Sequence, residues 1–221
     1  MVFVVIDGID GTGKGTQSLM LMKRLIAEGY SVKLMDFPRH SNPSAYFVDA
    51  YLNGEFSDKA EDVHPKTASL FYALDRFAAK KEMVSHLSSG GIIISNRYVS
   101  SNKGHQLGKI KDSTGRDEFL YWLDDLEYGI LGLPREDVNI LLNASPKVSQ
   151  INVDKKSTRS YTSKKRDLHE FDLEHLASAR EAYSYVAQKE NWHVIDCAPK
   201  HVMRPVEDIH EEIYSIVKPL I

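Results

Sequence analysis

Residues 8–17, "GIDGTGKGTQ", are the first group whose types and spacing could do chemistry, and they follow the apolar run "VFVVID". Gly8, Gly13 and Lys14 have the spacing of a phosphate-binding P-loop, with a strand predicted before it and a helix after it. Glycines let backbone N–H groups curve around phosphate oxygens, the start of the helix adds partial positive charge, and the lysine supplies a point charge. The alternative is a glycine-rich turn that binds no ligand. We therefore predict ATP binding by the following residues: Gly8, Gly11, Thr12, Gly13, Lys14, Gly15, Thr16 and Gln17.

One position departs from the strict P-loop pattern, and it concerns the metal. The pattern places Ser or Thr directly after the lysine, but here Gly15 follows Lys14 and the hydroxyl comes only at Thr16. Mg²⁺ keeps several waters and needs few protein ligands. We therefore expect Mg²⁺ to be held mainly by the nucleotide phosphates and water, with help from Thr16, Asp7 and Asp10.

The string "GKGTQ" resembles adenylate-kinase-like enzymes, and the chain has no Asn-Lys-x-Asp string that would read guanine. Both observations favour a nucleoside monophosphate kinase over a switch GTPase. A second stretch, "IIISNRYVSSNKGHQ" at residues 92–106, predicts on its own a polar loop at the carboxyl end of a strand, where doubly wound folds bind ligands. Taken with the P-loop, it resembles the thymidylate kinase family. The signature of that family is Asp-Arg-Tyr followed by small polar residues and a glutamine; Arg97 and Tyr98 match it, and Asn96 replaces the aspartate.

The resemblance implies roles for the residues of this stretch. Arg97 would contact the phosphates of donor and acceptor, which suits a planar fork of donors facing two anions that repel each other. Asp10, in the middle of the P-loop, would lie near the 3′-hydroxyl of the acceptor sugar and near the metal. The residues that would face the thymine edge or the sugar are Ser101, Asn102, His105 and Gln106.

Two further segments extend the resemblance. In "DFPRH", residues 36–40, Arg39 would contact the phosphate of the acceptor. The segment "LFYALDR", residues 70–76, resembles the family's helix that supplies Arg76 and an aromatic ring stacking on the base. Counting back from the arginine favours Tyr72 for the stacking position, with Phe71 one residue away. Helical periodicity alone predicts that one of these two rings belongs to the core.

Residues 153–167, "VDKKSTRSYTSKKRD", are strongly basic, and the resemblance implies that they form a mobile lid. Phosphoryl transfer depends mostly on positioning and on electrostatic stabilisation, so a cation that closes over the site supplies much of the catalysis. Members of the family that this chain resembles carry the cation either in the P-loop or on the lid; because Gly11 and Thr12 occupy the middle of the P-loop here, the resemblance implies that the lid provides it. The candidates are Arg159, Lys164, Lys165 and Arg166, and of these we assign Arg159 and Arg166 to catalysis. The alternative is a solvated run of charges.

The elements that must position these residues follow from short aliphatic runs separated by stretches of helical period. Strands are predicted at residues 2–7, 32–36, 91–95, 138–143 and 192–196. Helices are predicted at residues 14–28, 64–88 and 206–217, the first with Leu19, Met22, Leu25 and Ile26 on one face. This pattern predicts an α/β fold, a P-loop kinase with a five-stranded parallel sheet flanked by helices on both faces. We expect one domain over residues 1–221 that includes the lid.

Composition narrows the classes of partner. The 221 residues carry a net charge of −3, with 42% hydrophobic and 27% charged residues, so no basic excess points to nucleic acid or to a membrane surface. No apolar run approaches the roughly 18 residues of a membrane span. The single cysteine, Cys197, excludes an intrachain disulfide, predicts a cytoplasmic location and is expected to be buried at a strand end. The nine histidines show no metal-ligand spacing, and His175 is expected to be a surface or hydrogen-bonded helix residue.

The resemblance covers nearly the whole chain. It implies transfer of the γ-phosphoryl group of ATP to dTMP, giving dTDP and ADP, with Mg²⁺ as cofactor and a homodimer packed through helices. One alternative is a kinase for dUMP, UMP or a purine monophosphate, which would differ only around Tyr72, Ser101, Asn102, His105 and Gln106. The other alternative is a nucleotide-binding protein without turnover, suggested by Gly15 and Asn96.

Overall fold

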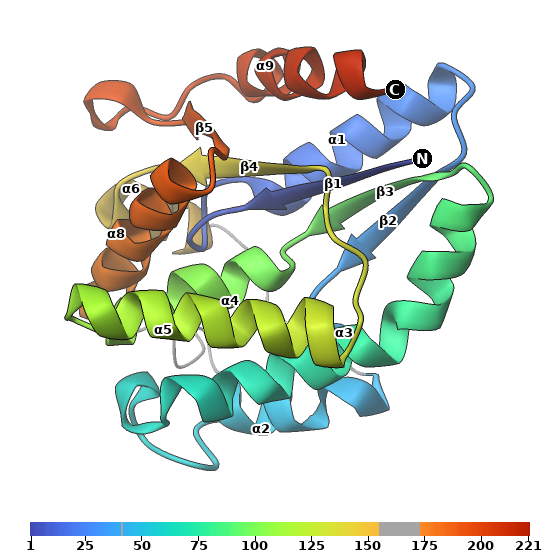
Figure 1. The fold of residues 1–221 in the computed structure, drawn as a ribbon. Helices are drawn as coiled ribbons and strands as arrows, with labels where there is room; N and C mark the ends of the chain where they lie inside the picture. Colours follow the sequence, from blue (N-terminus) through green and yellow to red (C-terminus); the bar gives the residue numbers. More distant parts are fainter. Residues whose placement is uncertain (41, 155–172) are drawn as a thin grey trace.

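Five parallel strands form one sheet in the order β2-β3-β1-β4-β5 (Figure 1). The computed structural model describes residues 1–40, 42–154 and 173–221. The strands are β1 (Val2–Asp7), β2 (Val32–Asp36), β3 (Ile92–Asn96), β4 (Val138–Asn143) and β5 (His193–Asp196). β1 pairs with β3 on one side, Val2 opposite Ile92, and with β4 on the other, Val4 opposite Val138. The predicted five-stranded parallel sheet is confirmed, with β3 and β5 each beginning one residue later than expected.

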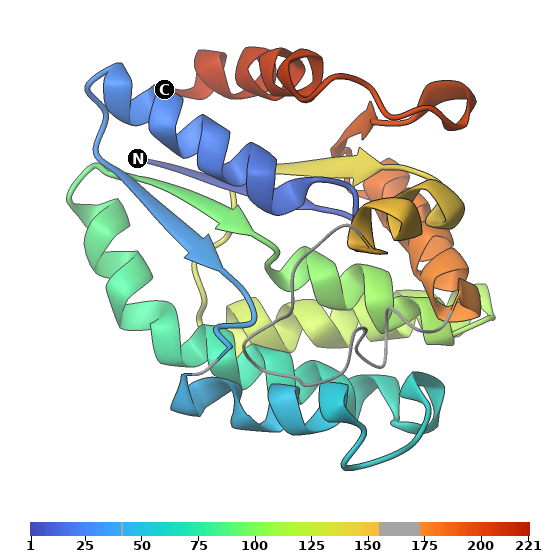
Figure 2. The ribbon, with the colours of Figure 1, turned by 180° about the vertical axis from the view of Figure 1, so that it is seen from behind.

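Helices cover both faces of this sheet, because neighbouring parallel strands can be joined only by crossover connections (Figures 1 and 2). α1 (Lys14–Ala27) and α9 (Val206–Val217) lie together on one face. The other face carries α3 (Pro65–Ser88), α4 (Val99–His105), α5 (Ser113–Asp124) and α8 (Leu173–Lys189). α2 (Tyr46–Asn53) packs against α3, α6 (Pro146–Asp154) follows β4, and a π-helical turn (Asp125–Ile130) extends α5.

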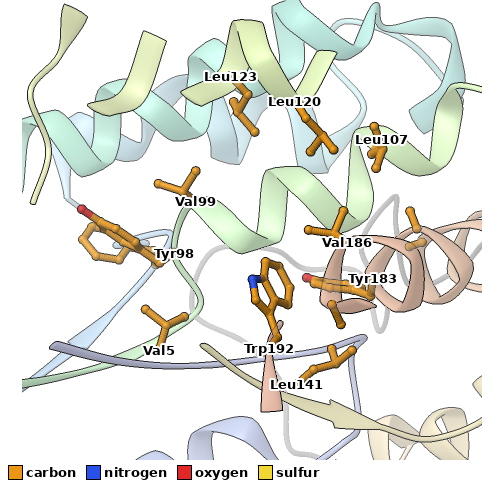
Figure 3. Close-up of a cluster of buried hydrophobic side chains, with 14 of the residues drawn as sticks. Val5, Tyr98, Val99, Leu107, Leu120, Leu123, Leu141, Tyr183, Val186 and Trp192 are labelled. Atoms are coloured by element: carbon orange, nitrogen blue, oxygen red, sulfur yellow. The ribbon is translucent and has the colours of Figure 1, made fainter. Parts of the chain in front are cut away.

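Two hydrophobic clusters hold the layers together. Successive residues of β1 alternate between them, with Val2, Val4 and Ile6 facing α1 and α9, while Phe3 and Val5 face α4, α5 and α8. Figure 3 shows the cluster that contains Val5, in which Tyr183 and Trp192 lie close to side chains of the sheet and of α4. Because both faces of the central strands are buried, these strands read in the sequence as continuous aliphatic runs.

The predicted face of the first helix is partly wrong. Leu19 and Ile26 are 40% and 49% exposed, while Leu21 and Leu25 are buried. The buried face of α1 also contains polar residues, among them Gln17, so the apolar residues alone do not mark it. The prediction of a polar loop after β3 is also wrong, because residues Val99–His105 form α4 and all of them are buried.

The fold brings the sequence motifs to one edge of the sheet. The P-loop follows β1, the segment with Arg39 follows β2, and Arg97 with α4 follows β3. In a parallel sheet the carboxyl ends of these three neighbouring strands lie side by side. These three motifs therefore lie together at this edge. The segment with Tyr72 and Arg76 lies on α3, which packs against β3 and α4.

The expectation that Cys197 is buried at a strand end is confirmed. Cys197, directly after β5, is fully buried, and this burial raises the pKa of its thiol to about 12. Within residues 1–40, 42–154 and 173–221, no helix combines the length and apolar character that a membrane span requires.

Candidate active site

The glycines of the P-loop are required by the shape of the turn. Gly8, Gly11 and Gly13 have φ values of 143°, 88° and 96°, which residues with side chains rarely adopt. A Cβ atom would lie 2.4 Å from the carbonyl oxygen of Leu142 at Gly8, and 2.0 Å from that of Ser149 at Gly11. At Gly13, which caps α1, a Cβ atom would meet only open space. The turn is therefore packed against β4 and α6 on one side and open at the start of the helix.

Lys14 lies inside this turn, and its side chain is 6% exposed. Its Nζ donates to the carbonyl oxygen of Ile9 at 2.9 Å and lies 3.6 Å from Oδ1 of Asp10. The hydroxyl of Thr12 donates to the same carbonyl oxygen at 3.0 Å. The ammonium group is thus held at the P-loop, where the loop and the helix N-terminus both favour an anion.

Of the remaining P-loop residues, Gln17 is buried in the protein, whereas Thr16 and Gly15 are exposed. Gln17 is buried, and its Nε2 donates to the carbonyl oxygen of Val206 at 2.8 Å, so its amide ties α1 to the start of α9. Thr16 is exposed on the first turn of α1. A Cβ atom at Gly15 would lie 3.7 Å from Nδ2 of Asn96, so the glycine faces the end of β3.

Arg97 meets the P-loop from the end of β3, and its backbone has the unfavourable left-handed φ of 67°. One guanidinium nitrogen, NH2, forms a short ion pair with Asp10. The other, NH1, lies 3.2 Å from Nε2 of His105 and 3.5 Å from the hydroxyl of Ser101. Burial acts to lower the pKa of Arg97, but Asp10, Tyr183 and Asp7 outweigh it and raise that pKa well above its ordinary value. The guanidinium is therefore a permanent cation beside the P-loop.

Asp7, the last residue of β1, organises this edge of the sheet. Its carboxylate accepts hydrogen bonds from Gly8 N at 2.7 Å, Ser100 Oγ at 2.6 Å, Ser101 Oγ at 2.7 Å and Tyr183 OH at 2.8 Å. A carboxylate offers about four lone-pair sites, and four donors occupy them here. Of the three residues predicted near the metal, Asp7 is therefore the one with the least capacity left for it.

The residues around Asn96 fit a site for Mg²⁺ that is held mainly by phosphates and water. Nδ2 of Asn96 donates to Oδ1 of Asp36 at 2.8 Å, and its buried Oδ1 has no partner among the described residues. Amide, hydroxyl and carboxylate oxygens, such as those of Asn96, Thr16 and Asp10, are the ligands that Mg²⁺ prefers. In the part of the chain that the structure describes, no three histidine, cysteine, aspartate or glutamate side chains form a set that could hold a metal ion.

Two of the residues predicted around the base, Arg76 and Asn102, share one buried carboxylate, that of Glu127 in the π-helical turn. Arg76 donates to both of its oxygens, one bond being short and the other 2.8 Å, and also to the carbonyl oxygen of Tyr98. Asn102 donates to the same carboxylate at 3.0 Å. Burial acts to lower the pKa of Arg76, but Glu127 raises it above its ordinary value. Gln106 is fully buried, and neither end of its amide has a partner among the described residues. An unsatisfied buried amide is costly, so a ligand here would gain a hydrogen bond.

Phe71 and Tyr72, the two candidates for stacking on the base, differ in their contacts with other aromatic rings in the structure. Phe71 stacks on Phe47 with ring centroids 5.7 Å apart and planes inclined by 16°, and its centroid lies 5.3 Å from that of Phe56. Tyr72 makes an edge-on contact with Tyr51 at 6.4 Å. Phe71 is thus part of an aromatic cluster between α2 and α3. Tyr72 packs against the same buried group at Tyr51, and it stays our candidate for stacking on a base.

Arg39 is fixed by Asp75, the buried neighbour of Arg76 on α3. The backbone N–H of Arg39 donates to Asp75 Oδ2 at 2.8 Å, its Nε donates to Oδ1 at 3.1 Å, and NH2 donates to Ser44 Oγ at 2.8 Å. The arginine side chain remains 19% exposed. Arg39 is therefore held in one orientation at the end of β2.

Part of the predicted site lies outside the described residues. This holds for the four lid candidates, Arg159, Lys164, Lys165 and Arg166. The predicted lid begins at Val153, which is a buried residue at the end of α6.

Sequence reasoning missed three residues that hold the site: Asp75, Glu127 and Tyr183. Asp75 stands beside Arg76 in "LFYALDR", so its position could have suggested it. Glu127 and Tyr183 reach their partners over 51 and 176 residues. No local pattern signals contacts of such sequence separation.

The thymidylate kinase family model matches residues 6–213 of this chain. The chain belongs to the thymidylate kinase family. It is 32% identical over 149 residues to thymidylate kinase of Mycobacterium tuberculosis, an alignment that covers 67% of this chain and 68% of the relative. It is 27% identical over 222 residues to the probable thymidylate kinase of Pyrobaculum aerophilum, covering 100% and 98% of the two chains.

Solved structures agree with this assignment at the level of the fold. The structure of thymidylate kinase from Candida albicans superposes with a TM-score of 0.73 at 20% identity, covering 99% of this chain and 91% of that one. The P-loop kinase fold expected from the sequence is therefore confirmed, and the chain is a phosphotransferase of the thymidylate kinase family.

Proposed function

We propose that this chain transfers the γ-phosphoryl group of ATP to dTMP, giving dTDP and ADP. One observation carries the proposal: the guanidinium of Arg97 lies at the P-loop, paired with Asp10, which is itself 3.6 Å from the ammonium of Lys14. Two cationic side chains at one P-loop suit a reaction between two phosphate groups, because each group would otherwise repel the other.

The reaction needs no nucleophilic side chain. An oxygen of the dTMP phosphate attacks the γ-phosphorus of ATP, the bond from the γ-phosphorus to the β,γ-bridging oxygen breaks, and ADP leaves with that oxygen. Charge spreads over the oxygens of the moving group during this step. We assign Lys14 and the N-terminus of α1 to stabilising the donor phosphates, and Arg97 to bridging donor and acceptor; the proximity of both cations to Asp10 supports this assignment.

Mg²⁺ is the expected cofactor, and when bound it would neutralise charge on the phosphates of ATP. We assign Thr16 and Asp10 to its surroundings, with Asp7 occupied mainly by its four hydrogen-bond donors. Oδ1 of Asn96, which has no partner among residues 1–40, 42–154 and 173–221, supports a bound water or metal near the end of β3. The lid cations Arg159 and Arg166 and the cytoplasmic location stay predictions.

The acceptor is tested by offering dTMP, dUMP, UMP, dGMP and AMP separately with ATP and Mg²⁺ and measuring ADP release. We expect the largest kcat/KM with dTMP, because we assign Tyr72 to stacking on the base and Asn102 and Gln106 to contacts with the thymine edge. The Candida albicans enzyme is described as having broad substrate specificity, so the ratios between acceptors are the quantity to compare. A larger kcat/KM for another acceptor would contradict the assignment. Binding of dTMP, seen as a raised melting temperature, without turnover of any acceptor would mean a binding protein.

Replacing Tyr72 by alanine should raise the KM for dTMP about tenfold or more, because stacking of a base on an aromatic ring contributes about 1–3 kcal/mol. The melting temperature should change little. Phe71→Ala is the matched control: it removes a ring that packs against Phe47 and Phe56, so it should lower the melting temperature and leave the KM for dTMP nearly unchanged. The opposite pattern would assign stacking to Phe71.

α3 also supports the proposed homodimer. Four large apolar side chains on it are exposed by 39–47% and recur at helical spacing on one face: Leu70, Leu74, Phe77 and Val84. Leu74→Asp should convert a dimer into a monomer in sedimentation velocity experiments. Leu19→Asp, at a leucine that is 40% exposed on α1, is the control and should remain dimeric. A wild-type monomer at micromolar concentration would refute the dimer without affecting the proposed reaction.

A further inference from the structure

A second buried histidine lies behind His105, and the mechanism above gives it no role. His175, on the first turn of α8, is 7% exposed, and His105, at the end of α4, is 5% exposed. Nε2 of His175 lies 3.3 Å from Nδ1 of His105, and Nε2 of His105 lies 3.2 Å from NH1 of Arg97. Two imidazole rings thus connect α8 to the guanidinium at the P-loop.

The orientation of the two rings shows that they meet through their edges. Their planes are inclined by 17° and their centroids lie 5.5 Å apart. A nitrogen–nitrogen distance of 3.3 Å at this centroid separation requires the rings to lie almost in one plane. That is the geometry of an N–H···N hydrogen bond, and face-to-face stacking would need a longer nitrogen–nitrogen distance.

The protons on the two histidines can be assigned by starting from Arg97, the last member of this row of hydrogen-bonded side chains. Arginine has donors and no acceptor, so Nε2 of His105 must accept from NH1 of Arg97. A neutral imidazole that accepts at one nitrogen carries its proton on the other, so Nδ1–H of His105 donates to Nε2 of His175. His175 must then present an unprotonated Nε2. The hydrogen bond from Arg97 thus determines the tautomer of His105, which in turn determines which nitrogen of His175 accepts.

We propose that His175 is a positioning residue for phosphoryl transfer: it fixes the tautomer of His105, whose Nε2 holds the guanidinium of Arg97 in place. This inference rests on the proposed role of Arg97 in the reaction. A neutral ring suits the task, because it accepts a hydrogen bond from Arg97 without competing for the charge of Asp10. Without His175, His105 can adopt its other tautomer, in which Nε2–H and the guanidinium both donate and repel each other.

The groups around His105 favour its neutral form. Burial lowers its pKa most, followed by the nearby charge of Arg97 and by His175, and Lys14 acts in the same direction. Asp10 opposes them, but the pKa of His105 still falls well below its ordinary value. From α8, the ring of Tyr183 meets His105 edge-on with centroids 5.7 Å apart. His105 should therefore remain neutral at pH 6.5, where a free histidine is half protonated.

The hydrogen-bond assignment is tested first without any turnover. In protein labelled with ¹⁵N-histidine, long-range ¹H–¹⁵N spectra report which ring nitrogen carries the proton, and His105→Gln identifies the signals among the nine histidines. We expect a neutral His105 protonated on Nδ1 at pH 6.5. Protonation on Nε2, or a charged ring at this pH, would overturn the proposal. Because this readout needs no dTMP or ATP, its outcome is independent of the proposed function.

Kinetics of two matched variants test the consequence. The side-chain oxygen of glutamine can accept where Nε2 of histidine accepts, whereas leucine fills the space without an acceptor. With ATP and dTMP, His175→Leu should lower kcat about five- to tenfold with a smaller change in the KM for dTMP, as expected for one lost hydrogen bond that acts in the transition state. His175→Gln should stay within about twofold of the wild type. A folded His175→Leu with wild-type kcat, or a His175→Gln as slow as the leucine variant, would overturn the proposal.

Discussion

Lys14→Met should lower kcat for dTDP formation by about a thousandfold or more, the largest loss that we expect from any single substitution in the described residues. The lysine is the first residue of α1, its side chain is 6% exposed, and its ammonium is held at the P-loop by the carbonyl oxygen of Ile9. Removing a preorganised charge from a site of phosphoryl transfer costs about this much, because no solvent replaces it at the right distance. Methionine keeps the apolar stem and packs in its place, so the fold should survive.

The control for this variant is Lys23→Met, at an exposed lysine of the same helix. It should retain wild-type kcat and melting temperature. If Lys14→Met lost less than about tenfold in kcat while its melting temperature was unchanged, the P-loop lysine would not contact the transferred group, and the mechanism above would be wrong.

Arg97→Lys should lower kcat about a hundredfold although the charge is retained. The guanidinium makes separate contacts through its two terminal nitrogens, NH2 with Asp10 and NH1 with His105 and Ser101. A lysine ammonium is a single point and cannot hold both sides at once. The left-handed backbone of Arg97 supports this reading, because a strained conformation persists where the surrounding structure fixes it for function.

Arg135→Lys is the matched control, since Arg135 is 63% exposed and lies outside the site. Steady-state kinetics with ATP and dTMP, together with melting curves, measure both variants. A kcat for Arg97→Lys that is close to wild type would show that one positive charge is sufficient there, and the bridging role of the guanidinium would be lost.

The P-loop and the sheet could be predicted because their causes are local. Gly8 and Gly11 are required by backbone conformation and by close contacts with neighbouring main chain, and the strands are aliphatic because both faces are buried. The face of α1 could not be predicted in the same way. Gln17 turns inward because it bonds to Val206, 189 residues away, and Leu19 turns outward as a result. Periodicity measures apolar spacing only, so a buried polar contact shifts the prediction.

The candidate site shows the same division. Lys14, Arg97 and Arg76 can be predicted as site residues because their motifs are short and resemble those of the family. The groups that orient them come from distant parts of the chain: Glu127 for Arg76, and His175, through His105, for Arg97. A polar stretch such as residues 99–105 can be buried as a helix because distant carboxylates satisfy its side chains: Asp7 for Ser100 and Ser101, Glu127 for Asn102, and Asp124 and Glu190 for Lys103. These contacts follow from tertiary structure and leave no spacing pattern in the sequence.

In the proposed reaction, the γ-phosphoryl group moves from ATP to dTMP at the site of Lys14 and Arg97. The most direct measurement follows that group, using ATP labelled with ³²P in the γ-position together with dTMP and Mg²⁺, and separating the products. We predict that the label appears in the β-phosphate of dTDP in the same amount as the ADP formed, with none released as inorganic phosphate. Label found in inorganic phosphate, or ADP formed without labelled dTDP, would contradict the account.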